Sequence, residues 1–185
     1  MDHVEIDLID MSSRSDGDMR YIVHMQDHVS KFCWAKALPS KQCSDVTHFI
    51  RSVFYNFGIP SILQSDNGGE FVGNELKSTL QEEFPNVQHR FINPRHPESD
   101  GLIERHNRVL EEHIGAWLQE NNRNDGWLEA VPRIIYNINI TYSRTINDIP
   151  FRFMFPRNHL VTNRAPDLES NHTLLADSEQ SSNPD

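Results

Sequence analysis

The sequence predicts an α/β domain in which helices cover both faces of a mixed five-stranded sheet. Three strand-like segments open the chain, joined by polar turns of the kind that connect antiparallel strands. Two further short strand patterns then alternate with stretches of helical periodicity, and two longer helical patterns follow. The length of 185 residues and the hydrophobic fraction of 37% suit one domain with an ordinary core.

The first strand is predicted by the alternating segment HVEIDLID. Its period of two places Glu5 and Asp7 on one face and the apolar residues between them on the other. A polar turn, SSRSDGD, follows, and residues 21–26 and 32–38 are the next two predicted strands. We expect these three strands to be antiparallel neighbours.

A helix is predicted after the third strand, with Asp45 as its N-terminal cap. Apolar residues recur along it at helical spacing: Val46, Phe49, Ile50, Val53, Phe54 and Phe57. Gly58 and then Pro60 should end it, and residues 61–64 predict a short buried strand. A helical pattern also covers residues 71–83, but it is weaker because its apolar residues are sparse.

Residues 87–92 predict the last strand, and the segment NPRHP that follows cannot be regular because of its two prolines. A long helix should begin at residue 98 or 101 and run to about residue 119, with Glu104 at the border of its apolar face. After a break at the segment NDG, residues 127–142 predict another helix. Trp117 and Trp127 on these helices are predicted either to belong to the core or to form an exposed patch that supports a homodimer.

The composition argues against several classes of protein. No apolar run is long enough to span a membrane, and the N-terminus has no signal-peptide pattern, so we expect an intracellular protein. Cys33 and Cys43 should be reduced structural thiols. The net charge of −10 argues against a simple nucleic-acid binder, although five acids and no Lys or Arg follow residue 165. We predict a domain over residues 1–158 and a disordered acidic tail over residues 159–185.

Three carboxylates on separate elements are the candidate site. Asp7 lies on the first strand, Asp66 follows a buried strand, and Glu104 lies on the long helix. Hard cations such as Mg²⁺ prefer carboxylate oxygens, so three such groups could converge on metal. Each also has an ordinary alternative: Asp66 as a turn residue, Glu104 as a surface partner of Arg108, and Asp7 at a solvent-facing strand edge.

Other sites receive no support. The chain has neither G-x-G-x-x-G after its first strand nor the G-x-x-x-x-G-K-[ST] loop, so no phosphate-binding loop is predicted. Ten histidines occur, but they lack the C-x-x-C partner of a zinc module, and we predict no structural zinc site.

The segments VEIDLID, LQSDNGGEF and HPESDGLIERHNRVL occur in this order and resemble the catalytic core of retroviral and gypsy-type retrotransposon integrases. The likeness runs from about Met1 to Asn158 and includes the later segment WLEAVPRIIYNINITYSRTINDIPFRFMF. It implies a ribonuclease-H-like fold with a D, D, E triad at Asp7, Asp66 and Glu104. In that interpretation two Mg²⁺ or Mn²⁺ ions are bound, with Asp7 bridging both, Asp66 holding one and Glu104 the other.

The resemblance also implies that Asn67, Gly69 and Asn107 shape or line the site, and Gly69 has the alternative role of giving the loop conformational freedom. The implied activity is DNA integration, in which a DNA 3′ end is trimmed and then joined to target DNA, in the nucleus and by a homo-oligomer. Glu111 departs from the retroviral pattern, which usually has a DNA-contacting lysine there. Two hypotheses therefore stay open. One is a metal-dependent strand-transfer core that needs a fused or separate basic domain to hold DNA, and the other is a host-retained or degenerate core that binds DNA or protein without catalysis.

Overall fold

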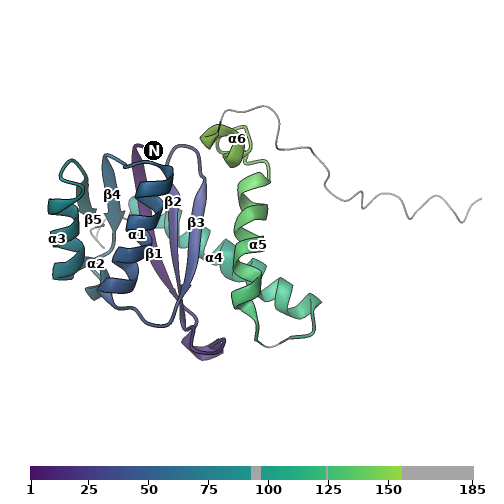
Figure 1. Ribbon diagram of the computed structural model, residues 1–185. Helices are drawn as coiled ribbons and strands as arrows, with labels where there is room; N and C mark the ends of the chain where they lie inside the picture. Colours follow the sequence, from purple (N-terminus) through teal and green to yellow (C-terminus); the bar gives the residue numbers. More distant parts are fainter. Residues whose placement is uncertain (93–96, 124, 156–185) are drawn as a thin grey trace, which may run out of the picture.

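The computed structural model describes residues 1–92, 97–123 and 125–155, and side chains are described outside residues 97–106. A single sheet has the strand order β3-β2-β1-β4-β5 (Figure 1). The strands are β1 (His3–Asp10), β2 (Tyr21–Asp27), β3 (Cys33–Leu38), β4 (Ile62–Ser65) and β5 (Gln88–Phe91). The first three pair antiparallel, whereas β4 runs parallel to both β1 and β5. The predicted mixed five-stranded sheet is therefore confirmed.

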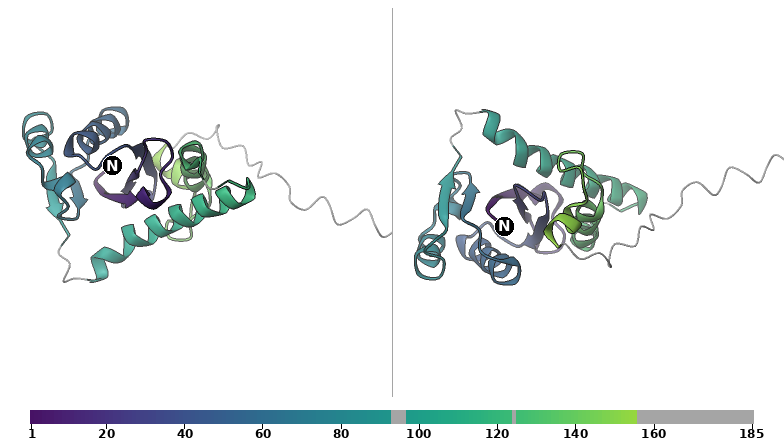
Figure 2. Two further views of the ribbon diagram at one scale, coloured as in Figure 1. Left: turned by 90° about the horizontal axis from the view of Figure 1, so that it is seen from below. Right: turned by 90° about the horizontal axis from the view of Figure 1, so that it is seen from above.

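Helices lie on both faces of this sheet (Figure 2). One face carries α1 (Cys43–Phe57), α2 (Gly69–Val72) and α3 (Asn74–Glu82), and the other carries the long helix α4 (Pro97–Glu120). Helix α5 (Trp127–Ile140) packs against α4 and the β3 edge, and the short α6 (Pro150–Met154) follows. A 3-10 turn, Ser12–Arg14, sits between β1 and β2. No helix in the described part of the chain is long and apolar enough to cross a membrane.

Alternation along β1 directs its side chains as predicted. Val4 and Ile6 are buried in the core formed with α1 and α3, whereas Ile9 joins the second core formed with α4 and α5. Glu5 and Asp7 therefore face the α4 side of the sheet. Glu5 is almost fully buried there, and the side-chain amide of Gln64 donates a hydrogen bond to it at 2.9 Å.

Two local predictions were wrong. Helix α1 begins at Cys43, so Asp45 lies in its first turn rather than at the cap, and its carboxylate accepts a 2.6 Å hydrogen bond from Ser40. The helix expected over residues 71–83 is split at Gly73, whose backbone is extended. A Cβ at Gly73 would lie 2.5 Å from Cys43 Sγ, so the close approach of α1 requires glycine there.

Helix α5 is attached to the sheet by two side chains from its ends. The Trp127 indole is fully buried, and its Nε1 donates to the carbonyl of Arg14 at 2.6 Å. Near the other end, Asn139 Oδ1 accepts from the Cys33 amide and Asn139 Nδ2 donates to the Cys33 carbonyl, both at 2.8 Å. Trp127 thus belongs to the core, whereas Trp117 is partly buried against the same cluster.

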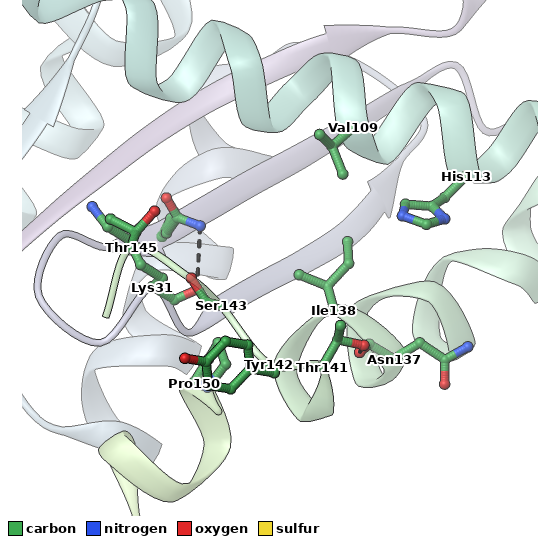
Figure 3. A pocket seen from close by; sticks show the side chains of 11 residues that line it. Lys31, Val109, His113, Asn137, Ile138, Thr141, Tyr142, Ser143, Thr145 and Pro150 are labelled. Carbon is green, nitrogen blue, oxygen red and sulfur yellow. Dashed lines mark hydrogen bonds between the residues drawn. The ribbon is translucent and has the colours of Figure 1, made fainter. Parts of the chain in front are cut away.

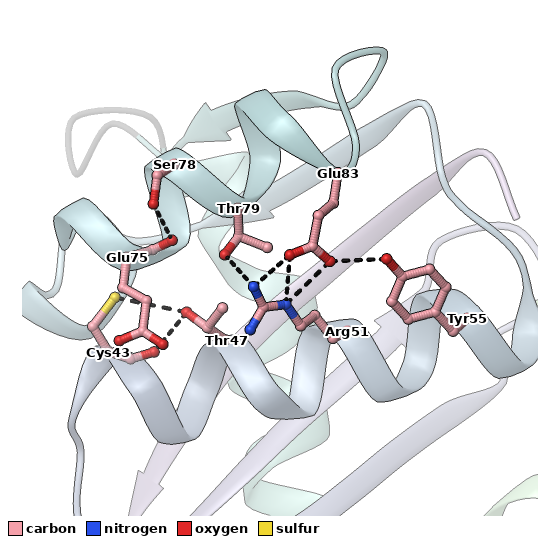
Figure 4. Close-up of polar contacts among 8 residues, drawn as sticks. All are labelled: Cys43, Thr47, Arg51, Tyr55, Glu75, Ser78, Thr79 and Glu83. Carbon is pink, nitrogen blue, oxygen red and sulfur yellow. Dashed lines mark hydrogen bonds and ion pairs between the residues drawn. The ribbon is translucent and has the colours of Figure 1, made fainter.

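Helices α1 and α3 are also joined on their outer surface by a polar group (Figure 4). The Arg51 guanidinium forms an ion pair with Glu83 and donates to Thr79 Oγ1 at 3.1 Å. The Tyr55 hydroxyl donates to the second Glu83 oxygen at 2.8 Å. The hydrogen bonds that Arg51 and Tyr55 donate to Glu83 hold the pKa of Glu83 below its ordinary value, with Arg51 making the larger contribution.

The remaining sequence predictions divide by region. Cys33 and Cys43 are free thiols, as predicted, and burial raises the pKa of Cys33 to about 12, which makes it a poor nucleophile. Of the segment predicted to be irregular, residues 93–97, the first four lie outside the described residues, as does the acidic tail 159–185, so those expectations remain predictions. The expectation was wrong for Pro97, which is the first residue of α4, a position where a helix tolerates proline.

Candidate acidic active site

The first two acids of the predicted site lie on neighbouring parallel strands. Asp7 is on β1, and Asp66 directly follows β4. The register pairs Glu5 with Gln64, so continuing it by two residues brings Asp66 beside Asp7. Asp7 lies on the α4 side of the sheet. Ile9, two residues further along β1 and therefore on the same face, packs in the core formed with α4 and α5.

Each of the two carboxylates accepts a hydrogen bond from a nearby backbone amide at its Oδ1 atom, and this bond orients the side chain. The Leu8 amide donates to Asp7 Oδ1 at 2.7 Å, and the Gly68 amide donates to Asp66 Oδ1 at 2.9 Å. The second oxygen of Asp7 accepts from Nδ2 of Asn107, on α4, at 2.5 Å. Because a carboxylate oxygen can accept more than one bond, each acid keeps acceptor capacity for a ligand.

Both burial and neighbouring acids disfavour the ionised form of Asp7. Burial raises its pKa above the ordinary value, and the charges of Asp66 and Glu70 raise it further. The hydrogen bonds from Leu8 and Asn107 act in the opposite direction but do not cancel the effect. Ionised Asp7 is therefore destabilised, and a cation bound beside it would relieve the repulsion.

Glu70, in α2, was missed by the sequence prediction although it lies within the segment SDNGGEF. A Cβ placed on Gly68 would lie 2.9 Å from Glu70 Oε2 and 3.0 Å from Asp66 Oδ1. The two carboxylates thus flank Gly68 closely, and any larger residue would push them apart. The pattern of an acid four residues after Asp66 was the available signal.

The other predicted site residues differ in how far the structure describes them. Asn107 reaches Asp7, whereas Asn67 is exposed, and Gly69 is the first residue of α2 with open space around its Cβ position. Glu104 belongs to α4, but its side chain lies outside the described residues. Among the side chains that are described, no three His, Cys, Asp or Glu residues are placed so that they could hold a metal ion.

A second residue that the sequence prediction missed is His24. It lies on β2 directly opposite Asp7, is 2% exposed, and its Nδ1 is 2.9 Å from Asn107 Oδ1. The sequence feature that could have indicated His24 is its position as a polar residue in the otherwise apolar segment YIVHM. Asp7, Asn107 and His24 therefore form one hydrogen-bonded chain from two strands and a helix.

Two cavities lie away from the acids. One, of about 300 Å³, lies between α4, α5 and the turn after β2, and Figure 3 shows Lys31, Ser143 and Thr145 gathered at one end of it. The Gln26 amide donates to the Lys31 carbonyl at its edge. The other, of about 440 Å³, lies between α2, α3 and β5. Neither is lined by Asp7 or Asp66, so neither is the acidic site.

The sheet order and the long helix across one face, with Asp7 on β1 and Asp66 directly after the parallel strand β4, are the arrangement of a ribonuclease-H-like core fold. Comparison with known proteins agrees, because residues 1–97 match the family described as Integrase core domain. The chain belongs to this family.

The curated relatives include a human protein and viral polyproteins. KRAB-A domain-containing protein 2 of Homo sapiens is 29% identical over 153 residues, which is 82% of this chain and 30% of that protein. The Gag-Pol polyprotein of Avian reticuloendotheliosis virus is 30% identical over 146 residues, 77% of this chain and 12% of the polyprotein. The chain thus spans less than a third of each of these relatives.

Solved structures show the same fold. A chain of the simian T-cell lymphotropic virus intasome, solved in complex with the PP2A regulatory subunit B56 gamma, superposes with a TM-score of 0.72 at 18% identity. The match covers 89% of this chain and 58% of that one. The catalytic core domain of BIV integrase gives a TM-score of 0.66 at 17% identity, covering 83% and 93%. The expected ribonuclease-H-like integrase core fold is confirmed.

Proposed function

We propose that this chain is the core of a metal-dependent DNA strand-transfer enzyme, with Asp7, Asp66 and Glu104 as its metal-binding acids. The observation that carries the proposal is the pair of acids on neighbouring parallel segments, Asp7 on β1 and Asp66 directly after β4, with one oxygen of each acid oriented by a backbone amide. Glu104 lies one turn before Asn107 on α4, the helix that reaches Asp7. Its role rests on the resemblance to integrases.

The donor set fits Mg²⁺ or Mn²⁺. Carboxylate oxygens are the ligands that these hard cations prefer. The pKa of Asp7 is raised by burial in the first place and by the charges of Asp66 and Glu70 in addition, and positive charge would offset both effects. When bound, a pair of divalent cations stabilises the charge that develops on the attacking and leaving oxygens during phosphodiester displacement. The ions would be expected in the space bounded by Asp7 and Asp66.

The chain's own residues contribute orientation. The amides of Leu8 and Gly68 fix one oxygen of Asp7 and of Asp66, and Asn107 fixes the second oxygen of Asp7. Such preorganisation reduces the entropic cost of binding cations and DNA in a reactive geometry. No side chain is required as a covalent nucleophile, since water or a DNA 3′-hydroxyl attacks the phosphate in this reaction class.

DNA is the proposed substrate, in a homo-oligomer and in the nucleus, as is typical of the family. The net charge of −10 is unfavourable for phosphate contacts, so we expect the chain to bind DNA weakly and to lose it at modest salt. A basic domain, fused or supplied as a partner, should be needed for efficient joining.

The test is DNA joining in Mg²⁺ or Mn²⁺ with a basic DNA-binding domain fused to the chain. The substrate is a short duplex with a free 3′ end, and wild type is compared with Asp66→Asn, which keeps the volume and removes one charge. Wild type should give joined and trimmed products, and the variant should give neither while remaining folded. Equal product from both proteins would show that Asp66 is not catalytic.

The second candidate is a core retained by a host, which binds DNA or protein without catalysis. The observation in its favour is the similarity to a human protein, KRAB-A domain-containing protein 2, as well as to viral polyproteins. Glu111, in place of a basic residue, points in the same direction. Binding of DNA or protein with no product from wild type in either metal would favour this function.

A further inference from the structure

The chain from His24 through Asn107 to Asp7 is built from parts that are far apart in sequence. His24 and Asp7 are directly opposed in the antiparallel pair of β2 and β1, so their side chains lie on the same face of the sheet. Asn107 enters from α4 and contacts both: Nδ2 lies 2.5 Å from Asp7 Oδ2, and Oδ1 lies 2.9 Å from His24 Nδ1. A single amide thus bridges the imidazole and the acid.

The chemistry of these groups fixes the direction of both hydrogen bonds. An ionised carboxylate can only accept, so Asn107 must present its NH₂ group to Asp7. Its carbonyl oxygen then faces His24, and the imidazole must donate from Nδ1. His24 is 2% exposed, and burial lowers its pKa, which favours the neutral ring. His24 is therefore the neutral tautomer that carries its proton on Nδ1.

A different residue at position 24 would leave the amide without this constraint. Rotation of the Asn107 amide by half a turn would aim its oxygen at Asp7, where two acceptors repel each other. The Nδ1–H group of His24 opposes that rotation, since it needs an acceptor at the position that Asn107 Oδ1 occupies. The orientation of the amide is then set by the strand residue opposite the acid.

We propose that His24 is a positioning residue, whose Nδ1–H fixes the Asn107 amide so that it donates to Asp7 Oδ2 and holds that acid in place. The inference deepens the proposed function, because it rests on Asp7 as a metal-binding acid. Because His24 is 2% exposed and bonds to Asn107, it acts through that amide. Partners of metal ligands that act in this way typically change metal affinity about 10- to 100-fold when they are removed.

The test uses two substitutions of the full chain, with Mn²⁺ binding measured by calorimetry. In His24→Asn the side-chain amide keeps a donor near the position of Nδ1, whereas His24→Leu fills the space without a donor. We expect His24→Leu to weaken Mn²⁺ binding about tenfold and His24→Asn to bind close to wild type. Gln26→Leu is the matched control, because Gln26 is buried on the same strand and face but bonds to the Lys31 carbonyl.

A double-mutant cycle with Asn107→Ala separates positioning from simple packing. If His24 acts through Asn107, then His24→Leu should cause no further loss of Mn²⁺ affinity in the Asn107→Ala background. Losses that add would overturn the proposal, as would an unchanged affinity in His24→Leu or an equal loss in Gln26→Leu. Melting temperatures of all variants identify any that lose the fold.

The ¹⁵N spectrum of the imidazole gives a readout that does not depend on metal. We expect the Nδ1–H tautomer in the metal-free wild type and loss of this preference in Asn107→Ala. An Nε2–H tautomer in wild type would overturn the inference. If wild type binds no Mn²⁺, the proposed function fails while the tautomer still decides whether His24 positions the amide.

Discussion

Replacing Asn139 by leucine should destabilise the protein strongly, because this side chain pairs with the backbone of an edge strand. Its amide exchanges two 2.8 Å hydrogen bonds with the N–H and C=O of Cys33, and both residues are almost fully buried. Leucine leaves one buried donor and one buried acceptor without partners, at about 1–3 kcal/mol each. We expect a loss of about 3 kcal/mol, in the lower half of the combined range of about 2–6 kcal/mol.

Urea unfolding followed by circular dichroism measures this loss. With an m value of about 2 kcal/mol/M, a loss of 3 kcal/mol lowers the midpoint by about 1.5 M. The control is Asn137→Leu, on the same helix but exposed, which should shift the midpoint by no more than about 0.3 M. A midpoint for Asn139→Leu as close to wild type as that of the control would refute the assigned role of Asn139.

Three further predictions concern the acids. Gly68→Ala should weaken Mn²⁺ binding measured by calorimetry, because its Cβ would lie within 3.0 Å of both flanking carboxylates, whereas Gly115→Ala, on α4, meets no atom and should bind normally. Asp7→Asn should reduce the fall in metal-free stability, measured in urea, that wild type shows as the pH rises. The raised pKa of Asp7 lets the folded state keep this proton to higher pH than the unfolded state, so wild-type stability falls as pH rises through that pKa. An advantage of the variant that grows on acidification would contradict this sign. Glu83→Gln should lower the melting temperature at pH 7 but not below the folded pKa of Glu83, since a depressed carboxylate pKa stabilises only above that range. A deficit that stays constant as the pH is lowered through the range in which folded Glu83 becomes protonated would exclude the ion pair with Arg51 as the cause.

Local patterns predicted most of the fold, because each element carries its own periodicity. The alternation around Asp7 placed it on the correct face of β1, and Gly58, with a φ of 108°, ended α1 as expected. The errors arose where a tertiary contact decides the local structure. The break at Gly73 depends on the sulfur of Cys43, thirty residues earlier, and no pattern within the helix itself records that neighbour.

The candidate site was predicted less completely for the same reason. Asp7 and Asp66 stand out in sequence because their flanking segments resemble a known family. His24 and Glu70 carry no such mark, since their importance depends on what lies beside them: His24 meets Asn107 across 83 positions, and Glu70 meets Asp66 around Gly68. A polar residue within an apolar strand or helix is a sequence feature that could have indicated the contact of His24 with Asn107 and that of Asn139 with Cys33.

The pairing of Asn139 with Cys33 also has a consequence for the time course of synthesis. The two residues are separated by 106 positions, which a ribosome translating about 5–20 residues per second covers in roughly 5–20 s. Throughout that interval the growing chain carries a β3 edge whose Cys33 donor and acceptor lack their final partner. Strand edges of this kind recruit other strands. Until α5 emerges, the β3 edge of the nascent sheet is therefore open to pairing with strands of other chains.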